Sequence, residues 1–246
     1  MPPEKTAELN EVSVTFNEMA ERLSHLIDRE YKARLLAADA EKKALQYQIS
    51  PHFLYNTYFQ LRNLILLEEK DQAQRLADLM GRYLRYIVRR KDASATLGDE
   101  MDHARNYADI QRMRFGDRIE VHYDIPEGVW RDMEVPRLLV QPLIENSFSH
   151  GLKEVEANGL IRLSLRQAEG TVEISVEDNG ESFPDSNLQA LREAVTQKGD
   201  SAEDGVALRN IHRRLQLYFG PESGLFFPRS SLGGLQVTIR IRNGKE

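Results

Sequence analysis

The 246-residue chain contains no cysteine, which excludes disulfide bonds, thiolate metal sites and cysteine nucleophiles. It also lacks an excess of basic residues, because 33 Lys and Arg stand against 39 Asp and Glu, a formal net charge of -6. Binding to a nucleic acid backbone needs a basic surface, so no nucleic-acid partner is expected. No apolar run approaches the roughly 18 residues of a membrane-spanning helix. We expect this stretch of chain to be cytoplasmic.

The composition is that of a folded protein, with 41% apolar and 29% charged residues, enough for one large domain or two small ones. In the first half, apolar residues recur at spacings of three and four, which predicts helices. The earliest of these stripes is typical of a coiled coil. The stripes consist of Leu9, Val12, Phe16, Met19, Leu23 and Leu26, then Leu54, Tyr58, Leu61 and Ile65, then Leu76, Met80, Tyr83 and Ile87.

The second half changes to a period of two, which is typical of half-buried strands. We expect a domain boundary at about residues 115–117, with a mixed α/β layer structure after it. A capping box formed by Thr96 and Asp99 predicts the start of the helix that precedes this boundary. Strands are expected near residues 119–125, 161–165, 172–176 and 237–241, and helices near residues 136–152, 186–195 and 208–219.

The first group of residues that could carry chemistry is Pro-His-Phe-Leu-Tyr-Asn at residues 51–56. His52 falls opposite the apolar stripe of its helix, so we expect it to face solvent. A neutral imidazole can act as a nucleophile, and Asn56, four residues on, lies on the same helical face. An isolated surface histidine is far more often only a solvated side chain, so this group alone decides nothing.

Three further groups lie in the second half. An asparagine set in a helix, here Asn146, can ligate a magnesium ion that also holds phosphate oxygens. Asp178 ends an alternating strand and could accept a hydrogen bond from an exocyclic amine, while Gly180 lets backbone approach a ligand closely. Residues 205–210 lead into a helix, whose N-terminus suits a phosphate. Each pattern alone is also ordinary turn or helix-end chemistry.

The order of these groups resembles that of the LytS/YesM-type sensor histidine kinases, and the resemblance covers most of the chain. It implies a fold that is α plus α/β. A helical dimerisation and phosphoacceptor hairpin, a four-helix bundle in the dimer, is followed by a Bergerat-type (GHKL) α/β sandwich that binds ATP. The motifs in the family's order are Pro-His-Phe-Leu-Tyr-Asn at residues 51–56, Arg-Phe-Gly-Asp-Arg at 114–118, Gln-Pro-Leu-Ile-Glu-Asn at 141–146, Asp-Asn-Gly at 178–180 and Gly-Gly at 233–234.

The resemblance assigns roles residue by residue. His52 is the phosphoacceptor, Asn146 the magnesium ligand and Asp178 the acid that reads adenine, with Gly180 beside the base. The cofactors implied are ATP and Mg²⁺. Asn56 and Glu145 are the other candidate catalytic residues, Glu145 as a base. Further nucleotide contacts are expected at His150, Lys153, Gly205, Leu208 and Asn210.

Domain limits and partners also follow from the resemblance. Residues 1–27 are similar to the end of a HAMP module, residues 28–116 form a signalling helix with the dimerisation and phosphoacceptor domain, and residues 117–246 form the catalytic domain. The expected partners are a second copy of the chain and a response regulator receiver domain. Transmembrane sensor helices are expected upstream, which would place the intact protein in a bacterial cell membrane.

Several positions depart from the family's pattern. Ser182 and Ala207 stand where glycine is usual, and Ser149 stands where a lysine is often found, a loss for which Lys153 or Arg213 could compensate. An alternative is therefore a dimeric signalling scaffold with a degraded nucleotide site. Another is a protein in which phosphatase action dominates.

Two residues bear on these alternatives. In the phosphatase reading, Asn56 orients a water molecule. Pro142 occupies the position at which related hydrolytic ATPases carry a water-activating glutamate. Its presence favours transfer to histidine over hydrolysis.

Overall fold

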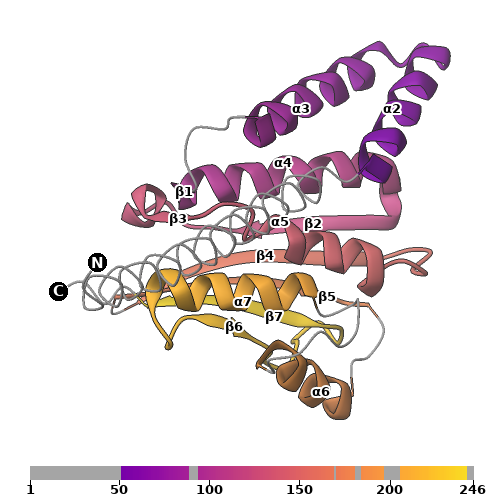
Figure 1. Cartoon of the computed structure of the whole chain (residues 1–246). Coiled ribbons are helices and arrows are strands. Elements are labelled where there is room, and N and C mark those ends of the chain that lie inside the picture. Colours follow the sequence, from indigo (N-terminus) through magenta and orange to yellow (C-terminus); the bar gives the residue numbers. More distant parts are fainter. Residues whose placement is uncertain (1–50, 89–93, 169, 181–183, 197–205, 243–246) are drawn as a thin grey trace, which may run out of the picture. The chain divides into compact units, whose positions relative to one another are not determined.

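The computed structural model describes residues 51–88, 94–168, 170–180, 184–196 and 206–242 (Figure 1). The helices in these ranges are α2 (Pro51–Leu66), α3 (Lys70–Val88), α4 (Leu97–Phe115), α5 (Gln141–Asn146), α6 (Asp185–Thr196) and α7 (Val206–Phe219). The strands are β1 (Ser94–Thr96), β2 (Ile119–Asp124), β3 (Glu134–Pro136), β4 (Gly159–Ala168), β5 (Thr171–Asp178), β6 (Gly224–Phe226) and β7 (Gln236–Arg242).

Contacts divide the chain into two compact units, Met1–Leu54 and Tyr55–Glu246. Only residues 51–54 of the first unit are described. The segment at residues 1–27 that resembles a HAMP module therefore lies outside the described residues.

The helix α3 packs on α4 through one apolar stripe, which confirms the predicted stripe except that Leu79 is buried in place of Met80. The helix α4 begins as the capping box predicts, since Thr96 Oγ1 accepts a hydrogen bond from the Asp99 backbone N–H at 3.1 Å. Its C-terminal cap is Gly116, with φ of 61°. The buried residues of α3 are Ala73, Leu76, Leu79, Tyr83 and Ile87.

The helix α2 differs from the prediction in which face it buries. Tyr58 and Ile65 of the predicted stripe are 59% and 61% exposed within the single chain, whereas Phe53 and Thr57 are buried. Large apolar side chains lie around much of this helix, so periodicity does not determine which face the chain covers. His52 is exposed, as predicted.

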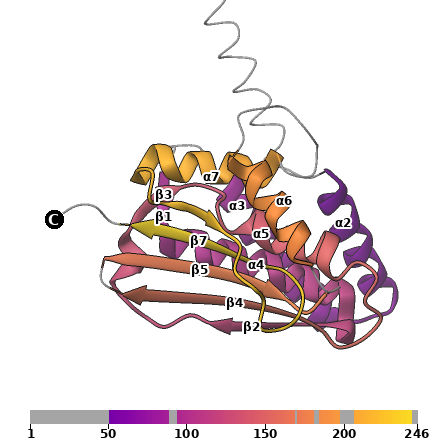
Figure 2. The same ribbon diagram turned by 90° about the horizontal axis from the view of Figure 1, so that it is seen from below.

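The second half is a five-stranded sheet in the order β2-β4-β5-β7-β6. The strands β2 and β4 run parallel and the other neighbours are antiparallel. Alternation gives the sheet one apolar face, to which β4 contributes Ile161, Leu163 and Leu165. The helices α5, α6 and α7 lie on one side of these strands (Figure 2). The predicted strands and the mixed α/β architecture are thus confirmed.

A two-stranded pairing of β1 with β3 joins α4 to the second half, with Ser94 opposite Pro136. The helix α4 also contacts β2 and α5. The predicted domain boundary after residue 116 falls between α4 and β2, which are in contact, and it stays a prediction.

The predicted helix at residues 136–152 is wrong in its extent. The helix α5 starts only at Gln141 and continues as a π-helical turn, Ser147–Gly151. Its start is delayed because residues 134–136 belong to β3 and because Leu138 has φ of 56°, in the left-handed region.

Candidate functional site

Asp178 lies at the end of β5 and is only 2% exposed. Its Oδ1 accepts hydrogen bonds from the backbone N–H groups of Gly180 at 3.1 Å and Leu235 at 3.3 Å. Burial raises the pKa of this carboxyl, while hydrogen bonds, from Ser147 first, act in the opposite direction. The carboxylate is therefore fixed in place by the backbone and is poised to accept from a further donor.

Three glycines surround Asp178. A Cβ on Gly180 would stand 2.0 Å from the carbonyl oxygen of Gly151, and a Cβ on Gly151 would stand 2.7 Å from the Asp178 carboxylate. A Cβ on Gly234 would stand 2.3 Å from Asp178 Oδ1. No side chain fits at these positions, so glycine is required by close backbone packing.

Glu177, next to Asp178, points to the opposite face of the sheet and fixes the loop that leads to Gly234. Its Oε1 accepts from Ser230 Oγ at 3.0 Å and from the Leu232 N–H at 3.1 Å, and also from the Ser231 N–H. Burial acts to raise the pKa of Glu177, but these hydrogen bonds outweigh it and hold the pKa below its usual value. Sequence reasoning missed this residue, although alternation along β5 places it opposite the core.

The helix α5 carries Glu145 and Asn146 at its last two positions, both partly buried. The π-helical turn that follows brings Gly151 against Asp178. The structure therefore joins two motifs that lie about 30 residues apart in the sequence. Among the described residues there is no group of three or more acidic or histidine side chains able to hold a metal by themselves. A magnesium ion on Asn146 would draw its remaining ligands from phosphate oxygens and water, as this ion commonly does.

Glu145 faces α3 and α4. Burial raises its pKa, and a hydrogen bond from Gln141 acts in the opposite direction. Burial also raises the pKa of Tyr83 to about 12, and the charge of Glu145 adds to this increase. A carboxylate with a raised pKa is a better proton acceptor, which is the property a general base needs.

The other predicted contacts are placed as follows. His150 and Lys153 are exposed on the segment after α5, and Asn210 is exposed on α7. Leu208 is 4% exposed, so its side chain packs in the core beneath α7. Gly205 and Ser182 lie outside the described residues.

The predicted phosphoacceptor group is on α2. His52 is exposed and Asn56 is partly buried, one helical turn further along. Among the helices that the structure describes, none is long and apolar enough to cross a membrane.

Two family models match the chain: histidine kinase over residues 40–119, and histidine kinase-, DNA gyrase B-, and HSP90-like ATPase over residues 132–245. The chain is 32% identical to the sensor histidine kinase YesM of Bacillus subtilis, over 92% of this chain and 37% of that protein.

Two more relatives give the same result. The sensor histidine kinase YpdA of Escherichia coli is 33% identical over 95% of this chain and 41% of that protein. The sensor protein LytS of Oceanobacillus iheyensis is 28% identical over 87% of this chain and 37% of that protein. The chain thus spans about two fifths of the length of these relatives.

Proposed function

Since the chain belongs to the sensor histidine kinases of the LytS/YesM type, we propose that it transfers the γ-phosphoryl group of ATP to its own His52. The phosphoryl group then passes to an aspartate of a response regulator. The observation that carries this proposal is the setting of Asp178. This residue is buried at the end of β5, three glycines pack closely around it, and one of them belongs to the turn that follows Asn146.

Adenine recognition is assigned to Asp178. Its carboxylate already accepts two backbone hydrogen bonds and has lone pairs left for an exocyclic amine. Hydrogen bonds to the charged form offset the burial that raises its pKa. A purine that presents an amine is therefore bound in preference to one that presents a carbonyl oxygen, because two acceptors facing each other repel.

The phosphates are assigned to the segment between α5 and β4. Asn146 would hold a magnesium ion, which would neutralise phosphate charge. His150, on the π-helical turn, and Lys153, two residues beyond it, are exposed and supply positive or hydrogen-bonding groups. Asn210 on α7 is the remaining polar candidate.

Transfer to His52 depends mainly on positioning, because phosphoryl transfer leaves little covalent chemistry to the protein. The neutral imidazole is the attacking form. Glu145 serves as the base that takes up the imidazole proton, in line with its raised pKa. Pro142 supplies no carboxylate to activate water, so hydrolysis is disfavoured.

A second copy of the chain is proposed to cover the open face of α2. Tyr55, Tyr58 and Phe59 are each more than half exposed there, as are Ile65 and Leu66. A patch of this kind in a folded protein marks an interaction surface. Pairing of α2 and α3 with the same helices of a second copy gives the four-helix bundle expected from the resemblance.

The test is incubation of the purified chain with γ-labelled ATP and Mg²⁺. We expect an acid-labile, base-stable label that is absent from His52→Gln and retained in His122→Gln, a matched change of an exposed histidine on β2. A chain that binds ATP but takes up no label would contradict the kinase assignment and favour a signalling scaffold. Label that persists in His52→Gln would contradict the assignment of the phosphoacceptor.

A further inference from the structure

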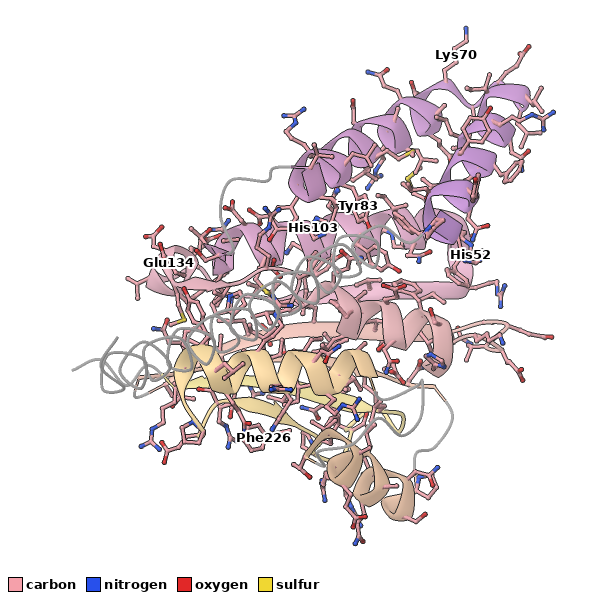
Figure 3. The ribbon with its side chains drawn as sticks, viewed as in Figure 1. His52, Lys70, Tyr83, His103, Glu134 and Phe226 are labelled. Carbon is pink, nitrogen blue, oxygen red and sulfur yellow. The ribbon has the colours of Figure 1, made fainter. Side chains whose placement is uncertain are left out.

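A buried polar cluster lies between α3, α4 and the start of α5. Its members are Tyr83 and Tyr86 of α3, Glu100 and His103 of α4, and Gln141 of α5. Tyr83 and His103 lie side by side between α3 and α4 (Figure 3). Glu100 and His103 are 0% and 4% exposed. Burial of so many polar groups lowers stability unless they are paired, so their hydrogen-bond partners determine what the cluster holds in place.

His103 connects all three helices. Its ring stacks on Tyr83 with centroids 5.1 Å apart and on Tyr86 at 4.1 Å. Its Nε2 makes a 2.7 Å hydrogen bond with Gln141 Oε1. Gln141 Nε2 in turn donates to the Tyr83 hydroxyl at 3.4 Å, at the limit of a hydrogen bond. The side chain of Gln141, the first residue of α5, is thus oriented from α4 and α3.

Glu100 holds the segment that precedes α5. Its Oε1 accepts from the Leu138 N–H at 2.6 Å and its Oε2 from the Leu139 N–H at 2.8 Å, and Tyr86 also donates to it. Leu138 has φ of 56°, a conformation that a leucine rarely adopts and that needs support from its surroundings. Glu100 supplies that support, since its two oxygens bind the backbone on both sides of the strained residue.

Arg137 adds a link to α7. Its guanidinium lies 4.4 Å from the ring centroid of Tyr86 and donates to the Tyr86 carbonyl oxygen. Its own carbonyl oxygen accepts from Arg214 Nη2 at 2.5 Å. Contacts with α3, α4 and α7 therefore hold the backbone between β3 and α5 in place.

The cluster reaches the candidate metal ligand through one turn of α5. Gln141 lies one helical turn before Glu145, and Glu145 precedes Asn146. Gln141 and Asn146 are the first and last residues of this six-residue helix, so we expect a displacement of Gln141 to displace Asn146 as well. We propose that Glu100 and His103 are positioning residues for the nucleotide site, which set the placement of α5, and so of Asn146, jointly with that of α3. This inference rests on the assignment of Asn146 to magnesium.

The test uses the full chain and two apolar replacements, His103→Phe and Gln141→Leu, alone and together. Phenylalanine keeps the stacking on Tyr83 and Tyr86 but loses the hydrogen bond. Each single variant leaves one partner of the hydrogen bond between His103 and Gln141 unpaired and is less stable, whereas the double variant removes both partners and regains the stability lost with this bond. The long contact of Gln141 with Tyr83 is lost in Gln141→Leu and in the double variant alike. The matched control is Asn106→Leu, which removes a 2.9 Å hydrogen bond from α4 to the Leu79 carbonyl of α3 and leaves α5 alone.

Equilibrium binding of Mg·ATP is the first measurement. We expect the double variant to bind roughly tenfold more weakly than wild type in spite of its recovered stability. Asn106→Leu should bind as wild type does, although it is destabilised. Wild-type affinity in the double variant, or an equal loss in Asn106→Leu, overturns the inference, because affinity would then follow stability alone.

Amide hydrogen exchange over residues 138–146 is the second measurement, and it needs no nucleotide. Exchange should be faster in the double variant than in wild type at equal global stability. If wild type bound no Mg·ATP, the proposed function would fail, and the inference would be judged on exchange alone. Unchanged exchange in the double variant overturns it.

Discussion

Replacing His103 with phenylalanine should remove a specific acid sensitivity of the fold. The side chain is 4% exposed, and burial, followed by the repulsion of Arg137, lowers its pKa from 6.5 to about 4. The folded state therefore excludes a proton that the unfolded chain takes up below about pH 6.5. The stability that the neutral ring contributes is present above that pH and is lost as the pH falls toward 4.

The size of the effect follows from these two values. The gap between 6.5 and about 4 corresponds to roughly 3 kcal/mol in full, of which about 2 kcal/mol falls between pH 7 and pH 5. Wild type should lose about 2 kcal/mol more unfolding free energy over this interval than His103→Phe does. Glu100, whose pKa is raised by burial, acts in the opposite direction, but it is present in both proteins.

Urea unfolding at pH 7 and pH 5 measures the difference directly. Loss of the hydrogen bond to Gln141 lowers the stability of the variant at both pH values and cancels in the comparison. Asn106→Leu, which removes a buried hydrogen bond of α4 but no titratable group, should show the pH dependence of wild type. Equal acid sensitivity in wild type and His103→Phe would refute the reasoning, since it would mean that the buried ring does not exclude the proton.

Other changes test the nucleotide site and the fold. Asp178→Asn should bind Mg·ATP at least tenfold more weakly, on the order of 1.4 kcal/mol, because an acceptor of the adenine amine is weakened; unchanged affinity in equilibrium binding would exclude its adenine contact. Gly180→Ala should lower unfolding free energy by about 1–3 kcal/mol, since its Cβ would meet the Gly151 carbonyl, whereas Gly81→Ala on α3, with nothing within 4 Å, should gain about 1 kcal/mol. The two variants should shift the midpoint of thermal unfolding in opposite directions, and shifts in the same direction would contradict this prediction. Thr96→Ala should lower the free energy of unfolding by about 1 kcal/mol, because it removes the N-cap of α4. An unchanged urea unfolding curve would show that this cap does not stabilise the protein.

The parts of the fold that the sequence predicts are those governed by local rules. Alternation places β2, β4, β5 and β7, and the capping box places the start of α4, because strand faces and caps depend on neighbours within a few residues. Local pattern also predicts the turn that contains Asp178 and Gly180, because it follows directly after an alternating strand. The periodicity of α2 does not predict its buried face, since apolar side chains lie around much of this helix.

The start of α5 and the residues that hold it were not predictable for a different reason. The helix α4 is covered on several sides, so its buried residues include Glu100, His103 and Asn106 as well as apolar ones, and no single stripe marks them. The backbone partners of Glu100, Leu138 and Leu139, lie about 40 residues further along the chain. Pairing over such a distance has no local signal.

The two ends of the proposed nucleotide site differ in how they are held in place. The adenine end, at Asp178, is fixed by backbone hydrogen bonds from Gly180 and Leu235, next to the ends of β5 and β7, and by close glycine packing, in which Gly180 meets Gly151 of the turn after α5 and Gly234 meets Asp178 itself. The phosphate end, at Asn146, is carried by a six-residue helix whose start is held by side chains of α3, α4 and α7. A shift of α3 should therefore lower the affinity for Mg·ATP by a larger factor than the affinity for adenosine, which lacks phosphates. Measured in His103→Phe combined with Gln141→Leu, a parallel loss of both affinities would contradict this division, because the disturbance would then extend to Asp178.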